Sequence, residues 1–284
     1  MSGLSYQGER KALGSKLLEL RKEAKLTGEQ LATRLGWVPS KVSKLETGKQ
    51  TASAEDIRAW AKQVGASAEI ADKLLAHLGT VHNEYITWRE QLRSGHHREQ
   101  QQLLEIEAES RLIRIFQPVL VPGLLQTADY ARARFVANSA WQGTPGDTDS
   151  AVATRMRRQA ILYDQHKQFQ FLITEAALCH RLCPRTAMVG QLDRLIMASA
   201  LPNVEIGIIP FDTEFAVSPL NSFVMFDGQL VIIETFTAEL KLRDAEEIAL
   251  YAKTFDQLRA IASLDDDART VLRRILEHSG PLNT

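Results

Sequence analysis

The sequence predicts a mainly helical chain that begins with a bundle of five short helices and ends in a mixed α+β domain. Apolar residues in the first 80 positions recur at the three- and four-residue spacing of amphipathic helices. Beyond residue 165, short stretches rich in β-branched and aromatic residues indicate strands. A chain of 284 residues is long enough for two domains. We therefore divide it into a first domain at 1–80, a helical connector at 81–116, and a second domain at 117–284.

The first two helices of the bundle are predicted from their apolar spacing and their end signals. One apolar face marks the first helix: Leu13, Leu17, Leu20 and Ala24. Thr27 can cap the second helix, because Gln30 three places later completes a capping box. Gly36 ends that helix, since glycine tolerates the positive φ of a helix C-cap.

Three further helices complete the bundle. Pro39 suits the first turn of the third helix, where a missing N–H costs nothing, and this helix ends near Gly48. Ser53 and Asp56 can cap the fourth helix. Apolar spacing then predicts the fourth helix from Ile57, Trp60, Ala61 and Val64, and the fifth from Ile70, Leu74, Leu75 and Leu78.

The rest of the chain mixes helices and strands. Residues 82–116 are polar with little apolar surface, which indicates one or two connecting helices, and residues 117–123 hold two prolines and are extended. Asp227-Gly228 between two apolar stretches is a strong hairpin signal. Strands are predicted at 169–174, 204–210, 222–226 and 230–236, and helices around residues 130–135, 152–163, 245–262 and 266–278.

Charge is distributed unevenly along the chain. The whole sequence has a net charge of −1, which points to no particular partner. Residues 1–50 carry ten Lys or Arg and five Asp or Glu, whereas the remaining residues carry 24 and 30. A basic first domain on an acidic body is typical of a domain that meets a polyanion, although a solvated surface can also be uneven.

Cysteine content and hydropathy predict the compartment. Only Cys179 and Cys183 occur, too few for a disulfide framework, and this fits a reducing environment. No apolar run is long enough to suggest a membrane span, and the first 25 residues lack the apolar stretch of a signal peptide. We expect a cytoplasmic protein that associates with the nucleoid when it binds DNA.

The third helix carries the candidate binding face. At about 100° per residue, Val38, Val42 and Leu45 share one side of this helix. The opposite side holds short hydroxyls and a lysine and no carboxylate: Ser40, Ser43, Lys44 and Thr47. Lys41 and Pro39 lie on the flanks, and Glu46 lies at the apolar edge, where it can make an internal polar contact. A polar face of a small helical bundle fits the same pattern, but Ser and Lys also suit the major groove of DNA.

The residue string decides between these two interpretations. Leu26-Thr-Gly-Glu-Gln-Leu-Ala-Thr-Arg-Leu-Gly36 followed by Ser40-Lys-Val-Ser-Lys-Leu-Glu-Thr-Gly48 resembles the Xre/Cro-repressor helix-turn-helix family. The resemblance implies that the third helix lies in the major groove of a double-stranded operator and that the second crosses the backbone. It implies base-facing positions at Pro39, Ser40, Lys41 and Lys44, and backbone contacts at Thr27, Gly28, Lys49 and Gln50. Gly28 and Pro39 depart from the usual residues, so the operator sequence does not follow from relatives.

A second resemblance covers the body of the chain. Gln117-Pro-Val-Leu-Val-Pro-Gly-Leu-Leu-Gln-Thr127 and Ile173-Thr-Glu-Ala-Ala-Leu178 are similar to WhiJ-like actinobacterial regulators. That family joins an Xre-type domain to a regulatory domain, and the resemblance implies a developmental transcription regulator, most simply a repressor. It also implies a small BldB-like partner protein that controls DNA binding. Arg155, Arg157 and Arg158 on one predicted helix could dock such an acidic partner or a phosphate, or they could be a solvated face.

Two rival classes of protein are weighed against a regulator of this kind. Cys179-His180-x-x-Cys183 offers at most three ligands, so two small buried hydrophobes beside a surface histidine explain it better than zinc. No phosphate loop or nucleophile motif is present, and we expect no enzyme, no metal and no cofactor. A small-molecule effector pocket in the second domain remains the alternative means of control. Because one such DNA-binding domain buries a small interface, we expect a homodimer.

Overall fold

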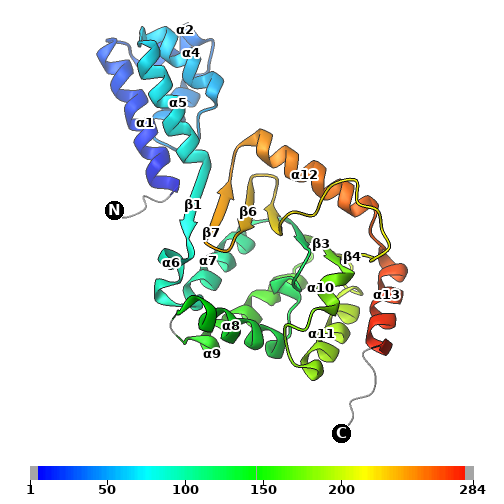
Figure 1. Cartoon of the computed structure of the whole chain (residues 1–284). Helices are drawn as coiled ribbons and strands as arrows, with labels where there is room; N and C mark the ends of the chain where they lie inside the picture. The colour runs from blue at the N-terminus through cyan, green and yellow to red at the C-terminus, as the bar shows by residue number, and fades with distance from the viewer. Residues whose placement is uncertain (1–5, 145, 279–284) are drawn as a thin grey trace. The chain divides into compact units, whose positions relative to one another are not determined.

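The computed structural model of the chain describes residues 6–144 and 146–278. They form two compact units, Met1–Glu84 and Tyr85–Thr284, which we describe separately. The predicted fold class is confirmed: the first unit contains five helices, and the second is built on a mixed sheet (Figure 1). Among the described residues, no helix is both long and apolar enough to cross a membrane.

The first unit is the predicted helical bundle. Its helices are α1 (Tyr6–Glu23), α2 (Gly28–Leu35), α3 (Pro39–Glu46), α4 (Ala54–Val64) and α5 (Ala68–His82). Thr27 and Ser53 cap α2 and α4 through complete capping boxes, and Gly36 ends α2 with φ 68°. The bundle closes over Leu31, Ile57 and Trp60, each with no exposed surface. These local signals in the sequence therefore define the helices correctly.

Close packing joins α1 to the end of α3. A Cβ placed on Gly14 of α1 would lie 2.5 Å from the carbonyl oxygen of Leu45 and 2.6 Å from that of Glu46. Glycine thus lets the two backbones touch. Val38 departs from our expectation, because it precedes α3 as its N-cap in extended conformation and is 64% exposed rather than buried with Val42 and Leu45.

The second unit is built on a seven-stranded sheet in the order β1-β7-β6-β5-β2-β3-β4. β2 lies near the middle, parallel to β3 and antiparallel to β5, so it joins a parallel half to an antiparallel half. The strands are β1 (Asn83–Thr87), β2 (Leu112–Gln117), β3 (Gln168–Thr174), β4 (Val204–Ile209), β5 (Phe223–Phe226), β6 (Leu230–Glu234) and β7 (Ala238–Leu242). Asp227 and Gly228 form the predicted hairpin turn with φ 50° and 63°.

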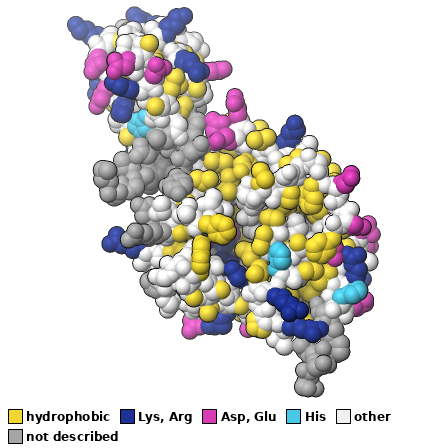
Figure 2. All heavy atoms as spheres, viewed as in Figure 1, with side chains coloured by type: hydrophobic (Ala, Val, Ile, Leu, Met, Phe, Trp, Pro, Cys, Tyr) yellow, Lys and Arg dark blue, Asp and Glu magenta, His cyan; other side chains and the backbone are white. Residues whose placement is uncertain are grey.

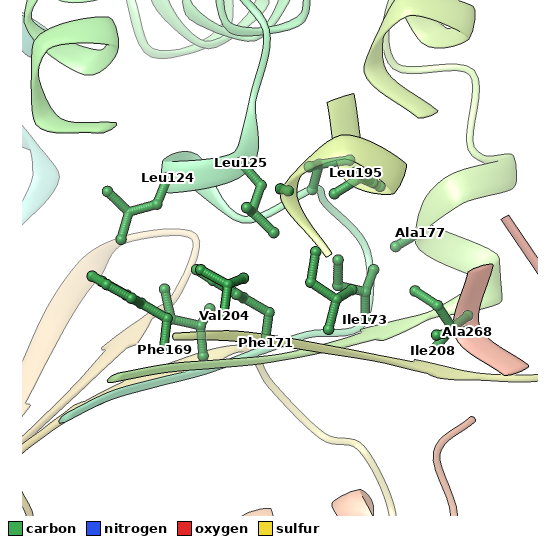
Figure 3. Close-up of a cluster of buried hydrophobic side chains, with 14 of the residues drawn as sticks. Leu124, Leu125, Phe169, Phe171, Ile173, Ala177, Leu195, Val204, Ile208 and Ala268 are labelled. Carbon is green, nitrogen blue, oxygen red and sulfur yellow. The ribbon is translucent and has the colours of Figure 1, made fainter. Parts of the chain in front are cut away.

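Helices pack on both faces of this sheet. The helices are α6 (Trp88–Gln91), α7 (His96–Glu109), α8 (Ala128–Gln142), α9 (Thr148–Arg158), α10 (Glu175–Cys179), α11 (Arg185–Ala198), α12 (Ala245–Ala260) and α13 (Asp265–His278), with short 3-10 turns η1 (Leu92–Ser94), η2 (Gly123–Leu125) and η3 (Gln159–Tyr163). Phe169, Phe171 and Ile173 of β3 point toward Leu124, Leu125 and Leu195 on one face (Figure 3). The intervening Leu172 packs with α12 on the other face. Side-chain alternation along a strand produces these two cores.

The segment that we expected to be a connector, residues 81–116, is divided differently in the structure. The boundary between the units follows Glu84, and α7 and β2 belong to the second unit. The polar residues of α7 are not all solvated, because Glu99, Gln100 and Glu107 are buried. Arginines of α9 donate to Gln100 and Glu107, and the sequence alone does not place them opposite each other.

Candidate nucleic-acid interface

The outward face of α3 is the first element of the candidate interface. Ser40, Ser43, Lys44 and Thr47 are all exposed, as the helical spacing predicts. The Lys44 ammonium has no hydrogen-bond or ion-pair partner among the described residues, and the Thr47 hydroxyl donates to the carbonyl of Ser43 over 2.7 Å. No carboxylate competes on this face, because Glu46 turns inward to Arg21 of α1. The face can therefore donate hydrogen bonds to an acceptor-rich partner.

A tight turn after α3 presents two more polar side chains. Gly48 adopts φ 66°, and a Cβ there would lie 3.0 Å from the backbone of Lys11. This turn brings the N–H groups of Lys49 and Gln50 back to the carbonyl of Lys44 at 2.9 and 3.1 Å. Both side chains are exposed at the end of the helix that carries the outward face.

The start of α2 supplies backbone donors. The Thr27 hydroxyl accepts from the N–H of Gln30, and the Gln30 side chain accepts from the N–H of Thr27, at 3.1 and 2.9 Å. The capping box leaves the N–H groups of Gly28 and Glu29 in the first turn, where helices have no internal acceptors. Such a helix start can bind a phosphate oxygen. Thr27 and Gly28 thus lie where the resemblance implied backbone contacts.

Lys41 takes a different place from the one that we expected. Its ammonium lies 2.7 Å from Asp56 of α4 and 4.0 Å from the ring centroid of Trp37. Asp56 is itself held, because it caps α4 through the N–H of Ser53 at 3.1 Å. Lys41 therefore ties α3 to α4 rather than extending freely toward a base.

An apolar residue extends the outward face at the start of α3. Val38 and Pro39 are both exposed, although we had placed Val38 in the core. The signal that could have placed it is its position before proline, because that residue is pushed into extended conformation and off the helical face. An exposed valine beside a polar face can make apolar contact with a partner, for example with the methyl group of a thymine.

The three arginines of α9 do not form one exposed surface. Arg157 alone faces solvent, and it donates to Gln101 at 2.9 Å. Arg158 is 5% exposed and forms a bidentate ion pair with Glu107 of α7. Arg155 donates to Gln100 at 2.9 Å and to Gln126 at 2.6 Å. The predicted docking face for a partner is therefore corrected, since α7 covers two of its three side chains.

Arg155 and Arg158 instead line a cavity of about 150 Å³ inside the second unit. Three carboxyls also line it, those of Glu99, Glu107 and Glu234, and a third arginine, Arg134, comes from α8. Burial and the nearby Arg158 lower the pKa of Arg155 to about 10. Burial and the nearby Glu99 and Glu239 raise the pKa of Glu234 to about 7. The sequence does not predict this cavity, because the lining residues come from segments that lie far apart along the chain.

The candidate metal residues lie on and after α10. Cys179 is exposed and Cys183 is half-buried, and burial raises the pKa of both thiols. His180 contacts the carbonyl of Val119 at 3.2 Å through Nδ1. Within residues 6–144 and 146–278, no group of three or more His, Cys, Asp or Glu side chains could hold a metal ion.

Comparisons with known proteins agree with the two-unit structure. Residues 12–74 match a helix-turn-helix domain, which defines the first unit as a DNA-binding domain. Residues 100–274 match a domain of unknown function, DUF5753, and this match spans more than half of the chain. The chain therefore belongs to the DUF5753 family. No curated protein matches it.

Solved structures show only remote likeness. NucT from Helicobacter pylori is 11% identical with a TM-score of 0.37, over 63% of this chain and 96% of that one. TrmBL2, described as an archaeal chromatin protein with a novel mode of DNA binding, is 12% identical with a TM-score of 0.34, over 74% of this chain and 69% of that one. Both scores are too low to indicate a shared fold.

Proposed function

We propose that this protein is a sequence-specific DNA-binding transcription regulator that reads the major groove with α3. The observation that carries the proposal is the outward face of α3, where hydroxyls and an unpartnered lysine are exposed without a carboxylate. The match of residues 12–74 to a helix-turn-helix domain supports it independently. Such a domain places the second helix of its helix-turn-helix motif, which corresponds to α3, in the major groove.

Each exposed group of α3 suits a different feature of DNA. Lys44 can donate to O6 or N7 of guanine, and Ser40 and Ser43 can reach either base type. Val38 and Pro39 at the start of the helix offer apolar contact to a thymine methyl group. We therefore expect an operator with at least one G·C and one A·T pair fixed within each half-site.

Phosphate contacts would hold this helix in register. The first turn of α2, which follows the Thr27 cap, can donate the N–H groups of Gly28 and Glu29 to a phosphate oxygen. Lys49 and Gln50 are exposed just after the C-terminal end of α3 and can reach the sugar-phosphate backbone of the DNA. Contacts of this kind contribute affinity without sequence preference and make binding depend on salt.

The test is selection of bound sequences from a random DNA pool by the full chain, followed by affinity measurements across salt concentrations. A reproducible motif and a steep fall in affinity with salt support the proposal. Equal affinity for all sequences would contradict sequence-specific reading.

We propose further that the protein binds as a homodimer on a repeated or palindromic site. One helix-turn-helix domain buries too little surface for tight operator binding. Two domains on half-sites one turn of DNA apart bury about twice that surface. Sedimentation of the free and DNA-bound protein measures the stoichiometry. One chain per operator at all concentrations would contradict the dimer.

The second unit is proposed to regulate DNA binding rather than to catalyse a reaction. Its thiols have raised pKa values, which disfavours a nucleophilic thiolate. The resemblance to WhiJ-like regulators supports control by a small BldB-like partner protein, and repression by occupying the operator is the simplest outcome. A reporter gene behind the selected operator, with and without the candidate partner, determines the sign of regulation.

Exposed aromatic residues give the partner hypothesis a place to be tested. Trp141 and Phe236 are 63% and 85% exposed, and their ring centroids are 5.9 Å apart. Hydrophobic side chains gather over the visible face of this unit (Figure 2). Replacing both residues by alanine should weaken binding of a purified partner, whereas Arg157→Ala serves as the comparison for the charged face. Loss with Arg157→Ala alone would favour a charged docking site.

A further inference from the structure

We propose that the cavity between α7, α8, α9 and the sheet binds a small zwitterion of the amino-acid class, with one ammonium and one carboxylate. This ligand would be the effector of the regulator. The inference builds on the regulatory role proposed for the second unit, but ligand binding itself can be measured without DNA. It uses Arg155 and Arg158, the arginines that are unavailable for a docking surface.

The size of the cavity limits the ligand. Its volume is about 150 Å³. An engineered cavity of that size holds benzene, so a ligand of roughly six to ten non-hydrogen atoms fits. Apolar walls come from Phe135, Phe226 and Leu124, which are each at most 3% exposed. A ligand with a short apolar body between two charged ends matches these walls.

Among the described residues, two carboxyls of the cavity wall are not paired with an arginine by a hydrogen bond or ion pair, those of Glu99 and Glu234. Glu99 is 7% exposed, accepts from the side chain of Gln100 at 3.1 Å, and faces Nδ1 of His96 at 3.5 Å. The Glu234 carboxyl makes no hydrogen bond or ion pair within the described part of the chain. Both residues line the cavity, and burial followed by repulsion from Glu99 raises the pKa of Glu234. An ammonium group between them would remove this repulsion.

Two guanidiniums of the cavity wall keep free donors, those of Arg134 and Arg155. Arg155 is held by Gln100 and Gln126 through Nε and Nη1, and its Nη2 has no acceptor among the described residues. Its guanidinium carbon lies 4.7 Å from the ring centroid of Phe135, which keeps the group in place. Arg134 donates only to Asn138, at 3.0 Å. Two arginines with free donors suit a carboxylate.

The third arginine in the wall is not free for a ligand. Arg158 and Glu107 form a bidentate pair with each other, and Arg158 also donates to Gln100. Apart from this pair, the cavity wall holds two carboxyls and two guanidiniums, so negative and positive groups are equal in number. A ligand with a single charge could pair with only one kind of these groups, whereas a zwitterion can pair with both.

His96 provides an independent sign of an incomplete site. Its ring is 3% exposed and lines the cavity, yet Nε2 has no hydrogen-bond partner. Buried polar atoms are normally satisfied, so an unpartnered one at a cavity wall can bind an atom of a ligand. The ring packs on Phe135 with centroids 5.3 Å apart, which fixes the direction of Nε2.

Trp88 offers a physical route from the cavity toward the chain segment that leads into the first unit. It lines the cavity and follows directly after β1 in the sequence. Its indole N–H donates to the carbonyl of Thr235 at 2.7 Å, and Thr235 is the neighbour of Glu234. A ligand held by Glu234 thus acts next to the anchor of Trp88.

The test measures thermal stability and calorimetric binding of the full chain, without DNA, against the L-amino acids one at a time. Each is compared with its decarboxylated amine and its deaminated acid. We expect at least one amino acid to raise Tm by a few degrees. Its amine and its acid should bind at least about ten-fold more weakly, because each lacks a partner for either the carboxyls or the guanidiniums of the cavity wall.

Two substitutions locate the binding site, and two others control for general effects. Glu234→Gln and Arg134→Gln should each weaken binding about ten-fold or more. Arg132→Gln, on the same helix but outside the cavity, and Glu214→Gln, on an exposed loop, should leave binding unchanged. Circular dichroism confirms that all variants are folded. The proposal is overturned if no amino acid binds, if the amine or the acid alone binds as tightly, or if the cavity substitutions have no more effect than the controls. None of these outcomes affects the operator selection experiment.

Discussion

The guanidinium of Arg21 in α1 donates two parallel hydrogen bonds to the carboxylate of Glu46 at the end of α3, at 2.5 and 2.9 Å. The same guanidinium donates to the carbonyl of Leu26 at 2.7 Å, so one side chain connects α1, the α1–α2 turn and the end of α3. Both side chains are about nine-tenths buried. The pair removes the only carboxylate of α3 from solvent and fixes the direction in which the helix points.

Glu46→Gln should therefore destabilise the first unit by about 2–3 kcal/mol, because a mostly buried guanidinium loses its charged partner. Hydrogen exchange resolved by peptide measures the opening free energy of α1 and α3. Glu69→Gln is the matched control, since the Glu69–Lys73 pair is exposed and should contribute less than about 0.5 kcal/mol. Equal losses in the two variants would show that the Arg21–Glu46 pair does not hold α3.

Gly14→Ala should cost about 2–3 kcal/mol, because the new Cβ meets the carbonyl oxygens of Leu45 and Glu46 and must push α3 away. Gly79→Ala on α5 is the control, since no atom lies within 4 Å of its Cβ and alanine favours a helix. Hydrogen exchange of α3 compares the two. A neutral Gly14→Ala would mean that α1 and α3 are not in backbone contact.

Lys44→Ala and Lys41→Ala should differ in kind. Lys44→Ala should weaken operator binding by about 1–3 kcal/mol and relax the preference at one base pair, with stability unchanged. Lys41→Ala should lower the stability of the first unit by about 1 kcal/mol, because it removes the contacts with Asp56 and Trp37, and should leave base preference intact. Selection of bound sequences and thermal unfolding separate the two effects. The opposite pattern would reverse our assignment of these lysines.

Arg158→Gln and Arg157→Gln are neighbours with different expected costs. Arg158→Gln leaves the buried Glu107 without its partner and should destabilise the second unit by about 3 kcal/mol or more. Arg157→Gln removes an exposed side chain and should change stability by less than about 0.5 kcal/mol. Urea unfolding measures both. Similar values would contradict the burial of Arg158 against α7.

Glu234 should give the second unit a measurable pH dependence. The residue has exposed surface, but desolvation of its carboxyl in the cavity wall raises the pKa from an ordinary value of 4.5 to about 7. The folded state thus holds the proton more tightly, so this contribution to stability is complete below pH 4.5 and is lost as the pH rises through about 7. Glu99 and Glu239 increase the effect, and Arg155 and Arg158 reduce it.

Glu234→Gln should therefore flatten the fall in stability between about pH 5 and pH 8 and should be more stable than the parent at the upper end. Urea unfolding at several pH values provides the curve. Glu214→Gln should keep the slope of the parent. An unchanged slope in Glu234→Gln would place its carboxyl in an ordinary aqueous environment.

Local signals predicted the first unit well, because helix caps and apolar spacing act within a few residues. Thr27 with Gln30 and Ser53 with Asp56 form the expected capping boxes, and Asp227-Gly228 forms the expected turn. The outward face of α3 was also predicted, since period alone determines which residues share a side.

Pairings between distant segments were not predictable in the same way. The polar sequence of α7 indicated a solvated connector, but Gln100 and Glu107 are buried against arginines more than fifty residues away. The strands β2 and β7 and the helix α11 were not predicted, and neither was the cavity. Tertiary contacts decide each of these features, and one sequence does not show which distant residues meet.

The central position of β2 has a consequence for how the chain forms. Its register pairs Leu112 with Gln168, so the parallel half of the sheet closes only after a loop of more than fifty residues has been made. Chains with such distant pairings fold more slowly than small helical bundles, and N-terminal domains fold first during synthesis. A ribosome-bound chain would thus carry a finished DNA-reading bundle before the second unit exists. Any restraint that the second unit places on operator binding begins only when synthesis is nearly complete.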